Sequence, residues 1–295
     1  SRQVGATVFV HAENGEILNF LRSECVKKGQ LTPHYHYVSR PPFTEAEAVR
    51  RAIYLAGQTD TPLYIAHMTC REAIAELQKA KGTGQRVSGE TCTHYLTTTK
   101  EVLDNPDFNE AAKFVCSPAL RDREDCEALW QALSDGLLTA VSSDHCGIDV
   151  AELKQAGRND FTQIPNGSPG AGDRLHMVWT EGVCTGKLTR QKFVDVIATQ
   201  PAKINGIYPR KGTLAVGSDA DVVIFDPNYE GTVHLADNPN GVDYNLYEGR
   251  RQSGRVETVL LRGQVVVENA KFVGRYGQGK FIPANMYASG YENRN

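Results

Sequence analysis

Short apolar runs alternate with longer amphipathic segments along the first half of the chain. Residues 6–10 and 62–66 are β-rich runs, and residues 86–92 form a weaker one. A fourth run leads into Asp144. Apolar residues recur at helical spacing in the segments between them, which are residues 16–28, 44–57, 69–81 and 122–133. This alternation predicts βα units around a parallel sheet.

Local signals suggest where these elements begin and end. Thr44 with Glu47, and Thr69 with Glu72, have the spacing of capping boxes and predict helix starts. Residues 29–42, rich in Pro, His and Tyr, are expected to form a loop. A short extended piece is expected at residues 114–116.

The pattern changes after Asp144. A loop rich in Gly, Pro and Asn is expected at residues 159–173, followed by helices at 174–182 and 189–199, the second stopped by Pro201. From Lys211 the pattern is all β, with Gly263 at a hairpin turn. The strands expected there are residues 212–214, 221–225, 256–261 and 264–268.

These elements predict an α/β fold with a barrel portion at residues 1–210. A small β-sheet (sandwich) domain is expected at 211–272 and a C-terminal tail at 273–295. About four βα units are present, whereas a closed (β/α)8 TIM-type barrel needs eight and roughly 250 residues. The chain also opens at Ser1 without a Met. We therefore expect the later part of a barrel from a processed or longer polypeptide.

Composition excludes several classes of function. The net charge is -3 with no basic run, which argues against a nucleic-acid partner. No apolar run approaches the roughly 20 residues of a membrane span, and no signal peptide is visible. The seven cysteines are odd in number and form no CxxC pair. Reduced thiols in a cytoplasmic protein are therefore expected, each a small buried apolar side chain.

Three potential metal ligands stand at the ends of predicted strands. His11, His67 and Asp144 each follow an apolar run. Imidazole nitrogen and carboxylate oxygen suit zinc, and the carboxyl ends of parallel strands meet at one edge. A single histidine after a strand is more often a hydrogen-bonded loop residue. For each residue taken alone, a metal ligand and a structural loop residue both stay open. Three such residues at equivalent strand ends favour one metal site.

Other polar residues have weaker patterns. His34 and His36 are spaced as a metal-binding pair, but no strand precedes them, so a solvated or subunit-contact loop is predicted. His94 follows the third strand and is expected to be structural. The side chain of His145 should point away from that of Asp144. Asn166 lies in a predicted turn, although its amide also offers a donor and an acceptor to an amide ligand.

Several motifs, taken in order, resemble the dihydropyrimidinase/hydantoinase family of the amidohydrolase superfamily. The similarity is collinear from about residue 6 to residue 272, which makes it more specific than any single motif. The motifs are residues 10–15 (VHAENG), 39–41 (SRP), 64–67 (YIAH), 142–146 (SSDHC), 164–167 (IPNG), 208–212 (YPRKG) and 216–221 (VGSDAD).

The resemblance implies a two-zinc centre that opens a cyclic amide, a dihydropyrimidine or hydantoin, to an N-carbamoyl amino acid. By similarity, His11 and His67 would ligate the second zinc. Asp144 would ligate the first and shuttle the proton. Ser117 and Asn166 would hold the amide edge of the substrate, largely through backbone groups. A cytoplasmic homotetramer is also implied.

The family pattern includes elements that this sequence does not show. An HxH motif, a carboxylated lysine that bridges the metals and a tyrosine that supports the oxyanion are expected upstream of Ser1. The chain resembles roughly the C-terminal three-fifths of a family member, so we do not expect it to build the full site alone. The alternatives are a non-enzymatic scaffold similar to the collapsin response mediator proteins, an inactive fragment, or an allantoinase or dihydroorotase. The retained His67 and Asp144 favour an enzyme.

Overall fold

A four-stranded parallel sheet forms the centre of the N-terminal part. The computed structural model describes residues 1–285. The strands lie in the order β1 (Val8–Val10), β2 (Leu63–Ile65), β3 (Val87–Cys92) and β4 (Ala140–Ser142). All three strand pairs are parallel. The predicted βα pattern and the four predicted strands are confirmed.

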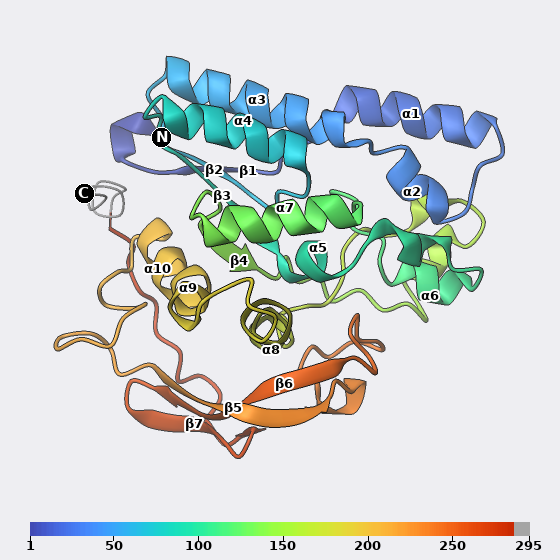
Figure 1. Cartoon of the computed structure of the whole chain (residues 1–295). Coiled ribbons are helices and arrows are strands. Elements are labelled where there is room, and N and C mark those ends of the chain that lie inside the picture. The colour runs from blue at the N-terminus through green and yellow to red at the C-terminus, as the bar shows by residue number, and fades with distance from the viewer. Residues whose placement is uncertain (286–295) are drawn as a thin grey trace.

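Long amphipathic helices cover one side of this sheet (Figure 1). The helices at residues 42–58, 71–82 and 123–134 share one apolar core with the strands, as the helical spacing predicts, whereas Cys25 of the first long helix packs in a separate cluster. No helix within residues 1–285 is long and apolar enough to cross a membrane. The long helices are α1 (Gly15–Lys27), α3 (Pro42–Gln58), α4 (Arg71–Gly82) and α7 (Arg123–Ser134).

The two predicted capping boxes are wrong. Helix α3 begins at Pro42, two residues before Thr44, because a proline is pre-organised for the first helical turn. Thr44 lies inside the helix and its hydroxyl donates to the carbonyl of Pro41. Helix α4 has no side-chain cap, and Thr69 donates instead to Glu45 on α3. A tertiary contact thus binds the side chain of Thr69, which the local spacing assigns to a cap, whereas the hydroxyl of Thr44 makes a local bond.

Short helices and irregular segments fill the connections. Residues 29–42 are not simply a loop, since α2 (His34–Val38) lies within them. The extended piece predicted at 114–116 belongs to none of the strands within residues 1–285. Two further short α-helices of this part are α5 (Thr93–Thr97) and α6 (Phe108–Ala112), and short 3-10 helices lie at Lys100–Asp104 and Lys154–Gly157.

The helices after the long loop are each extended by a π-helical turn. Helix α8 (Arg174–Val178) continues into such a turn at Trp179–Val183. Another turn, Asp195–Thr199, joins α9 (Arg190–Val194) to α10 (Gln200–Ile204). Pro201 therefore does not stop the helix. It lies in the first turn of α10, where its missing N–H costs little.

The C-terminal part forms a separate antiparallel sheet, as predicted. Its strands, in order, are β5 (Val222–Thr232), β6 (Arg251–Leu261), β7 (Gln264–Glu268) and β8 (Lys271–Phe272). Figure 1 shows it on the far side of α8–α10 from α3 and α4. Residues 212–214 are not a strand.

The predicted hairpin turn between β6 and β7 is confirmed. Leu261 pairs with Gln264, which leaves Arg262 and Gly263 as a two-residue loop. Both have positive φ, 49° and 79°, as a type I′ turn requires. Of the predicted tail, residues 286–295 lie outside the described part, and residues 273–285 hold neither helix nor strand.

All seven cysteines are free thiols. Five are buried, as predicted for small apolar side chains: Cys25, Cys70, Cys92, Cys116 and Cys126. The prediction is wrong for Cys146, which is half-buried, and for Cys184, which is exposed. Both lie outside the strands and the long helices that form the core.

Candidate active site

His11 and His67 lie side by side at the carboxyl edge of the parallel sheet. The pairing of Val10 with Ile65 puts the ends of β1 and β2 at the same level. Nδ1 of His11 is 2.9 Å from Nε2 of His67. His67 has a φ of 33°, a left-handed conformation that non-glycine residues seldom adopt. Such outliers cluster at functional sites.

A buried ion pair orients His11. Its Nε2 lies 3.0 Å from a Glu13 carboxylate oxygen, and Nη1 of Arg40 donates to both oxygens of that carboxylate. Burial opposes the charge on Glu13, but the hydrogen bond from His11 and the charge of Arg40 outweigh it and lower the pKa of Glu13 to about 2. Because a carboxylate only accepts, Nε2 of His11 carries the proton. The lone pair on Nδ1 therefore faces His67.

A second buried network holds the chain just after His67. The Glu45 carboxylate accepts hydrogen bonds from the backbone N–H and the hydroxyl of Thr69. The Arg121 guanidinium donates to Glu45, to the Thr69 hydroxyl and to the backbone carbonyl of Arg40. The network thus connects the backbone of Arg40 with the loop after β2.

Asp144 lies near this pair without joining it. The residue is exposed, follows β4 and has a φ of 44°. Burial and the adjacent His11 lower the pKa of His67, and the Asp144 carboxylate opposes them. Within residues 1–285, no three His, Cys, Asp or Glu side chains form a group that could hold a metal ion. The structure therefore brings His11 and His67 into contact and places Asp144 within electrostatic reach.

The two residues expected to hold the substrate also meet. The Ser117 hydroxyl donates to Oδ1 of Asn166 over 2.6 Å, and Nδ2 of Asn166 donates to the carbonyl of Ile164. The backbone N–H of Gly167 donates to the carbonyl of Val115. Two loops that are 49 residues apart in the chain are thereby joined at one point.

The remaining histidines have varied environments. The prediction of a solvated or contact loop is wrong for His36, which is buried on α2 and donates from Nε2 to the carbonyl of Cys116 over 2.7 Å. His34 is partly exposed and contacts Asp104. His94 is buried on α5, with no hydrogen-bond partner for Nε2 within residues 1–285. Nδ1 of His145 accepts from the backbone N–H of Gly170.

Replacing His36 with Gln is expected to make the protein less sensitive to acid. Burial, with a smaller effect of Arg40, lowers the pKa of His36 to about 3, whereas an unfolded histidine titrates near 6.5. Below pH 6.5 the unfolded state binds a proton that the folded state excludes, so stability falls as the pH falls. At pH 5 this costs about 2 kcal/mol. Urea unfolding at pH 7.5 and 5.0 should show a smaller loss for H36Q, and an equal loss would contradict the assignment.

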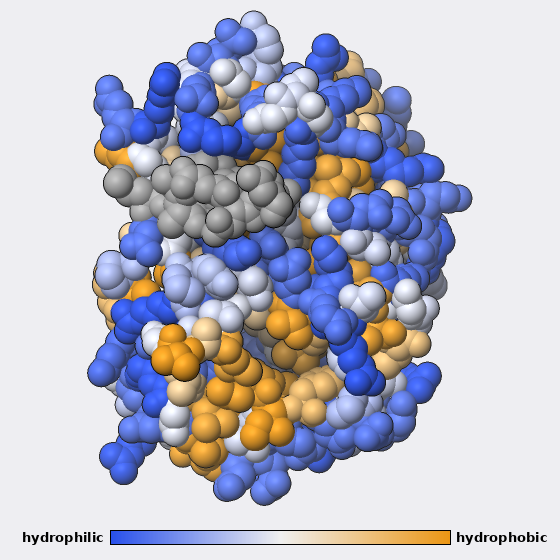
Figure 2. All heavy atoms as spheres, turned by 60° about the vertical axis from the view of Figure 1, so that its left-hand side comes forward, coloured by the Kyte–Doolittle hydropathy of each residue, from blue (hydrophilic) through white to orange (hydrophobic). Residues whose placement is uncertain are grey.

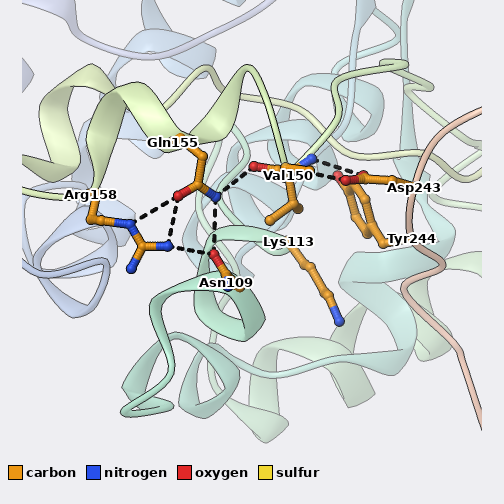
Figure 3. A pocket seen from close by; sticks show the side chains of 8 residues that line it. Asn109, Lys113, Val150, Gln155, Arg158, Asp243 and Tyr244 are labelled. Carbon is orange, nitrogen blue, oxygen red and sulfur yellow. Dashed lines mark hydrogen bonds between the residues drawn. The ribbon is translucent and has the colours of Figure 1, made fainter.

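A separate surface pocket lies away from these residues (Figure 3). Its polar groups already bind one another. Gln155 donates to Asn109 and to the carbonyl of Val150, and Arg158 donates to Gln155 and Asn109. None of the predicted site residues lines it.

Comparison with known proteins identifies the family of the chain. The model of the amidohydrolase family matches residues 2–266. The chain belongs to this family. It is 47% identical over 285 residues to a D-hydantoinase of Ralstonia pickettii, covering 97% of this chain and 62% of the relative. It is 39% identical over 281 residues to a dihydropyrimidinase of Arabidopsis thaliana, covering 95% of this chain and 53% of the relative.

A solved structure agrees equally well. The dihydropyrimidinase of Brevibacillus agri superposes with a TM-score of 0.95 at 44% sequence identity, covering 97% of this chain and 62% of that one. The predicted resemblance to dihydropyrimidinases and hydantoinases is confirmed. The chain spans about three-fifths of the length of the D-hydantoinase and of this solved relative.

The sequence alone did not reveal Glu13, Arg40, Glu45 and Arg121 as site residues. Glu13 and Arg40 lie in two of the quoted motifs, VHAENG and SRP. The presence of both residues in these motifs is the sequence signal that could have identified them as a pair. Glu45 and Arg121 are 76 residues apart, and no local pattern joins them.

Proposed function

We propose that the chain contributes to the site of a metal-dependent cyclic amidohydrolase that opens a hydantoin or dihydropyrimidine ring to an N-carbamoyl amino acid. The observation that carries this proposal is the contact between His11 Nδ1 and His67 Nε2 at the ends of two parallel strands. It occurs in a chain that is 47% identical to a D-hydantoinase.

The donor set fits zinc. Two nitrogens bound to one tetrahedral zinc at 2.0–2.1 Å are about 3.3 Å apart, close to the 2.9 Å found here. Glu13 also fixes the tautomer in which Nδ1 of His11 is free to ligate. We propose His11 and His67 as ligands of one zinc and Asp144 as a ligand of a second. A bound zinc pair would polarise the carbonyl and lower the pKa of water to about 7.

The side chains of this chain would supply the remaining steps. The exposed carboxylate of Asp144 accepts a proton from the attacking water and returns it to the leaving ring nitrogen. Ser117 and Asn166 hold the amide edge of the ring, largely through backbone groups. The Glu13–Arg40 pair keeps the imidazole of His11 in one orientation. Since both directions share one transition state, ring closure uses the same groups.

We also propose the finer features of the fold. The sheet β1–β4 would be part of a (β/α)8 barrel, since Phe9 of the edge strand β1 is 61% exposed. The sheet β5–β8 would form one layer of a sandwich. Figure 2 shows apolar surface gathered over the lower part of this view. Val223 and Ile224 of β5 are exposed. A cytoplasmic homotetramer remains a prediction from the resemblance.

Turnover by the full-length protein tests the proposed function. After loading with zinc, it is expected to convert hydantoin or dihydrouracil to the N-carbamoyl product, measured by chromatography. No product from either ring would overturn the proposal. Residues 1–295 alone are expected to hold zinc weakly, because residues 1–285 contain no group of three potential ligands. Two tightly held zinc ions per chain, measured by elemental analysis, would contradict that expectation.

A further inference from the structure

A fully buried lysine lies directly beneath the two proposed substrate loops. Lys154 begins the 3-10 helix Lys154–Gly157 and is 0% exposed. Its ammonium donates to the carbonyl of Val115 over 3.2 Å and to the carbonyl of Gly167 over 2.8 Å. Those carbonyls lie two residues before Ser117 and one residue after Asn166. One side chain therefore binds both loops at their bases.

Other contacts make the same junction stiff. The N–H of Gly167 shares the carbonyl of Val115 with Lys154. His36 binds the next carbonyl, that of Cys116. On the other side of the junction, the Ser117 hydroxyl donates a hydrogen bond to the side chain of Asn166. The relative position of the two loops thus depends on a few hydrogen bonds, and Lys154 makes two of them.

Burying this charge is costly, and no acid in the described part of the chain is paired with it. Ion pairs within residues 1–285 do not include Lys154. Burial lowers the pKa of its ammonium to about 8, with the nearby Cys116 and Cys146 opposing the change. An apolar side chain of similar volume would avoid this desolvation cost. Stability alone therefore does not require a charge at position 154. This points to a role for Lys154 in the site formed by Ser117 and Asn166.

The lysine cannot easily move away. A side chain at Gly157 would place its Cβ 2.6 Å from the backbone nitrogen of Ile164, so the 3-10 helix is packed directly on the Asn166 loop. On the outer side, Figure 3 shows Gln155 and Arg158 of this region hydrogen-bonded to Asn109. Lys154 is therefore held against the loops from below.

We propose that Lys154 is a positioning residue that sets the relative placement of Ser117 and Asn166 and thereby tunes the affinity for the amide edge of the cyclic substrate. This inference rests on the proposed function. The lysine itself is beneath the loop surface and needs no contact with the substrate. Its removal should loosen both loops together and should affect binding more than the chemical step.

The kinetic test uses the metal-loaded full-length protein. Lys154→Met is expected to raise the KM for hydantoin or dihydrouracil about 10- to 100-fold, corresponding to the loss of one or two hydrogen bonds, with kcat within about threefold. Lys154→Arg, which keeps the charge and the donors, should recover part of the loss. The matched control Lys187→Met, at a partly exposed lysine paired with Glu127, should keep the wild-type KM. A merely structural role would reduce the amount of active enzyme and leave KM unchanged, which would overturn the proposal.

Hydrogen exchange decides the question without turnover. In Lys154→Met, the amides of residues 112–118 and 164–168 should exchange together at least about tenfold faster, while those of α3 and α7 keep their wild-type rates. Wild-type exchange in both loops would overturn the proposal even if no ring is hydrolysed. Failure of the wild-type enzyme to turn over either ring would instead overturn the proposed function. Should Lys154→Met not fold, Lys154→Gln serves in both measurements, and unchanged KM and exchange would again overturn the role.

Discussion

Replacing Asp144 with Asn is expected to lower the kcat of the metal-loaded full-length protein by roughly 10²- to 10⁴-fold. An amide cannot accept the proton of the attacking water and return it to the ring nitrogen. The fold should persist, because the side chain is exposed and Asn has nearly the same shape. Steady-state hydrolysis of hydantoin and a thermal melt of each protein measure the two effects.

The control separates proton transfer from a general loss of negative charge. Asp135→Asn makes the same chemical change at an exposed residue, the C-cap of α7, and should leave kcat as in the wild type. The metal content of each variant should be measured as well, since Asp144 is also a proposed ligand. A kcat for Asp144→Asn within threefold of the wild type would remove Asp144 from proton transfer.

The fold of the N-terminal part was predictable because its strands are short apolar runs, and β2, β3 and β4 are mostly buried. Strand β2 is buried at every position, so its sequence is a continuous apolar run that ends abruptly at a polar residue. His67 follows this run, so the parallel topology of the sheet puts it at the carboxyl edge. Parallel strands bring their carboxyl ends to one edge, which is why the contact of His11 with His67 follows from two separate sequence patterns.

The supporting network was not predictable for a physical reason. Each of its members is a charged residue that pattern analysis assigns to the surface, and only tertiary folding reveals its partner. Glu45 lies on a helix face that periodicity alone cannot distinguish from a solvated one. The same holds for His36. Pro33 before it predicts a loop, yet His36 is the buried residue of helix α2. Sequence reasoning therefore found proposed ligands but missed the groups that orient them.

The hydroxyl of Thr69 illustrates how local and tertiary demands compete. Its spacing to Glu72 satisfies a capping rule, yet the hydroxyl binds Glu45 on another helix. A carboxylate buried beside Arg121 needs several donors, and a charged acceptor forms a stronger hydrogen bond than a neutral one. Helix α4 consequently begins without a side-chain cap. The cost of that missing cap is about 1 kcal/mol, less than that of leaving a buried carboxylate short of a donor.

Replacing Arg121 with Met is expected to lower the free energy of unfolding by roughly 3–5 kcal/mol. Arg121 and Glu45 are both almost fully buried, with side chains 5% and 2% exposed. Burial opposes the charge on Arg121, but the Glu45 carboxylate outweighs it and raises the pKa of the guanidinium. Removing the guanidinium leaves the Glu45 carboxylate buried without its counter-ion and the carbonyl of Arg40 without its donor. Urea unfolding at pH 7.5 measures the loss.

A double-mutant cycle separates the pair from its surroundings. Glu45→Gln removes the opposite charge while its amide oxygen can still accept from Thr69, and the double variant removes both charges. The double variant should be more stable than the sum of the two single losses predicts, because neither charge is then left unpaired. Arg123→Met, at an exposed position in the first turn of α7, is the matched control and should change stability by less than about 0.5 kcal/mol. Strictly additive losses would mean that Arg121 acts through its hydrogen bonds to Thr69 and Arg40 rather than through its charge.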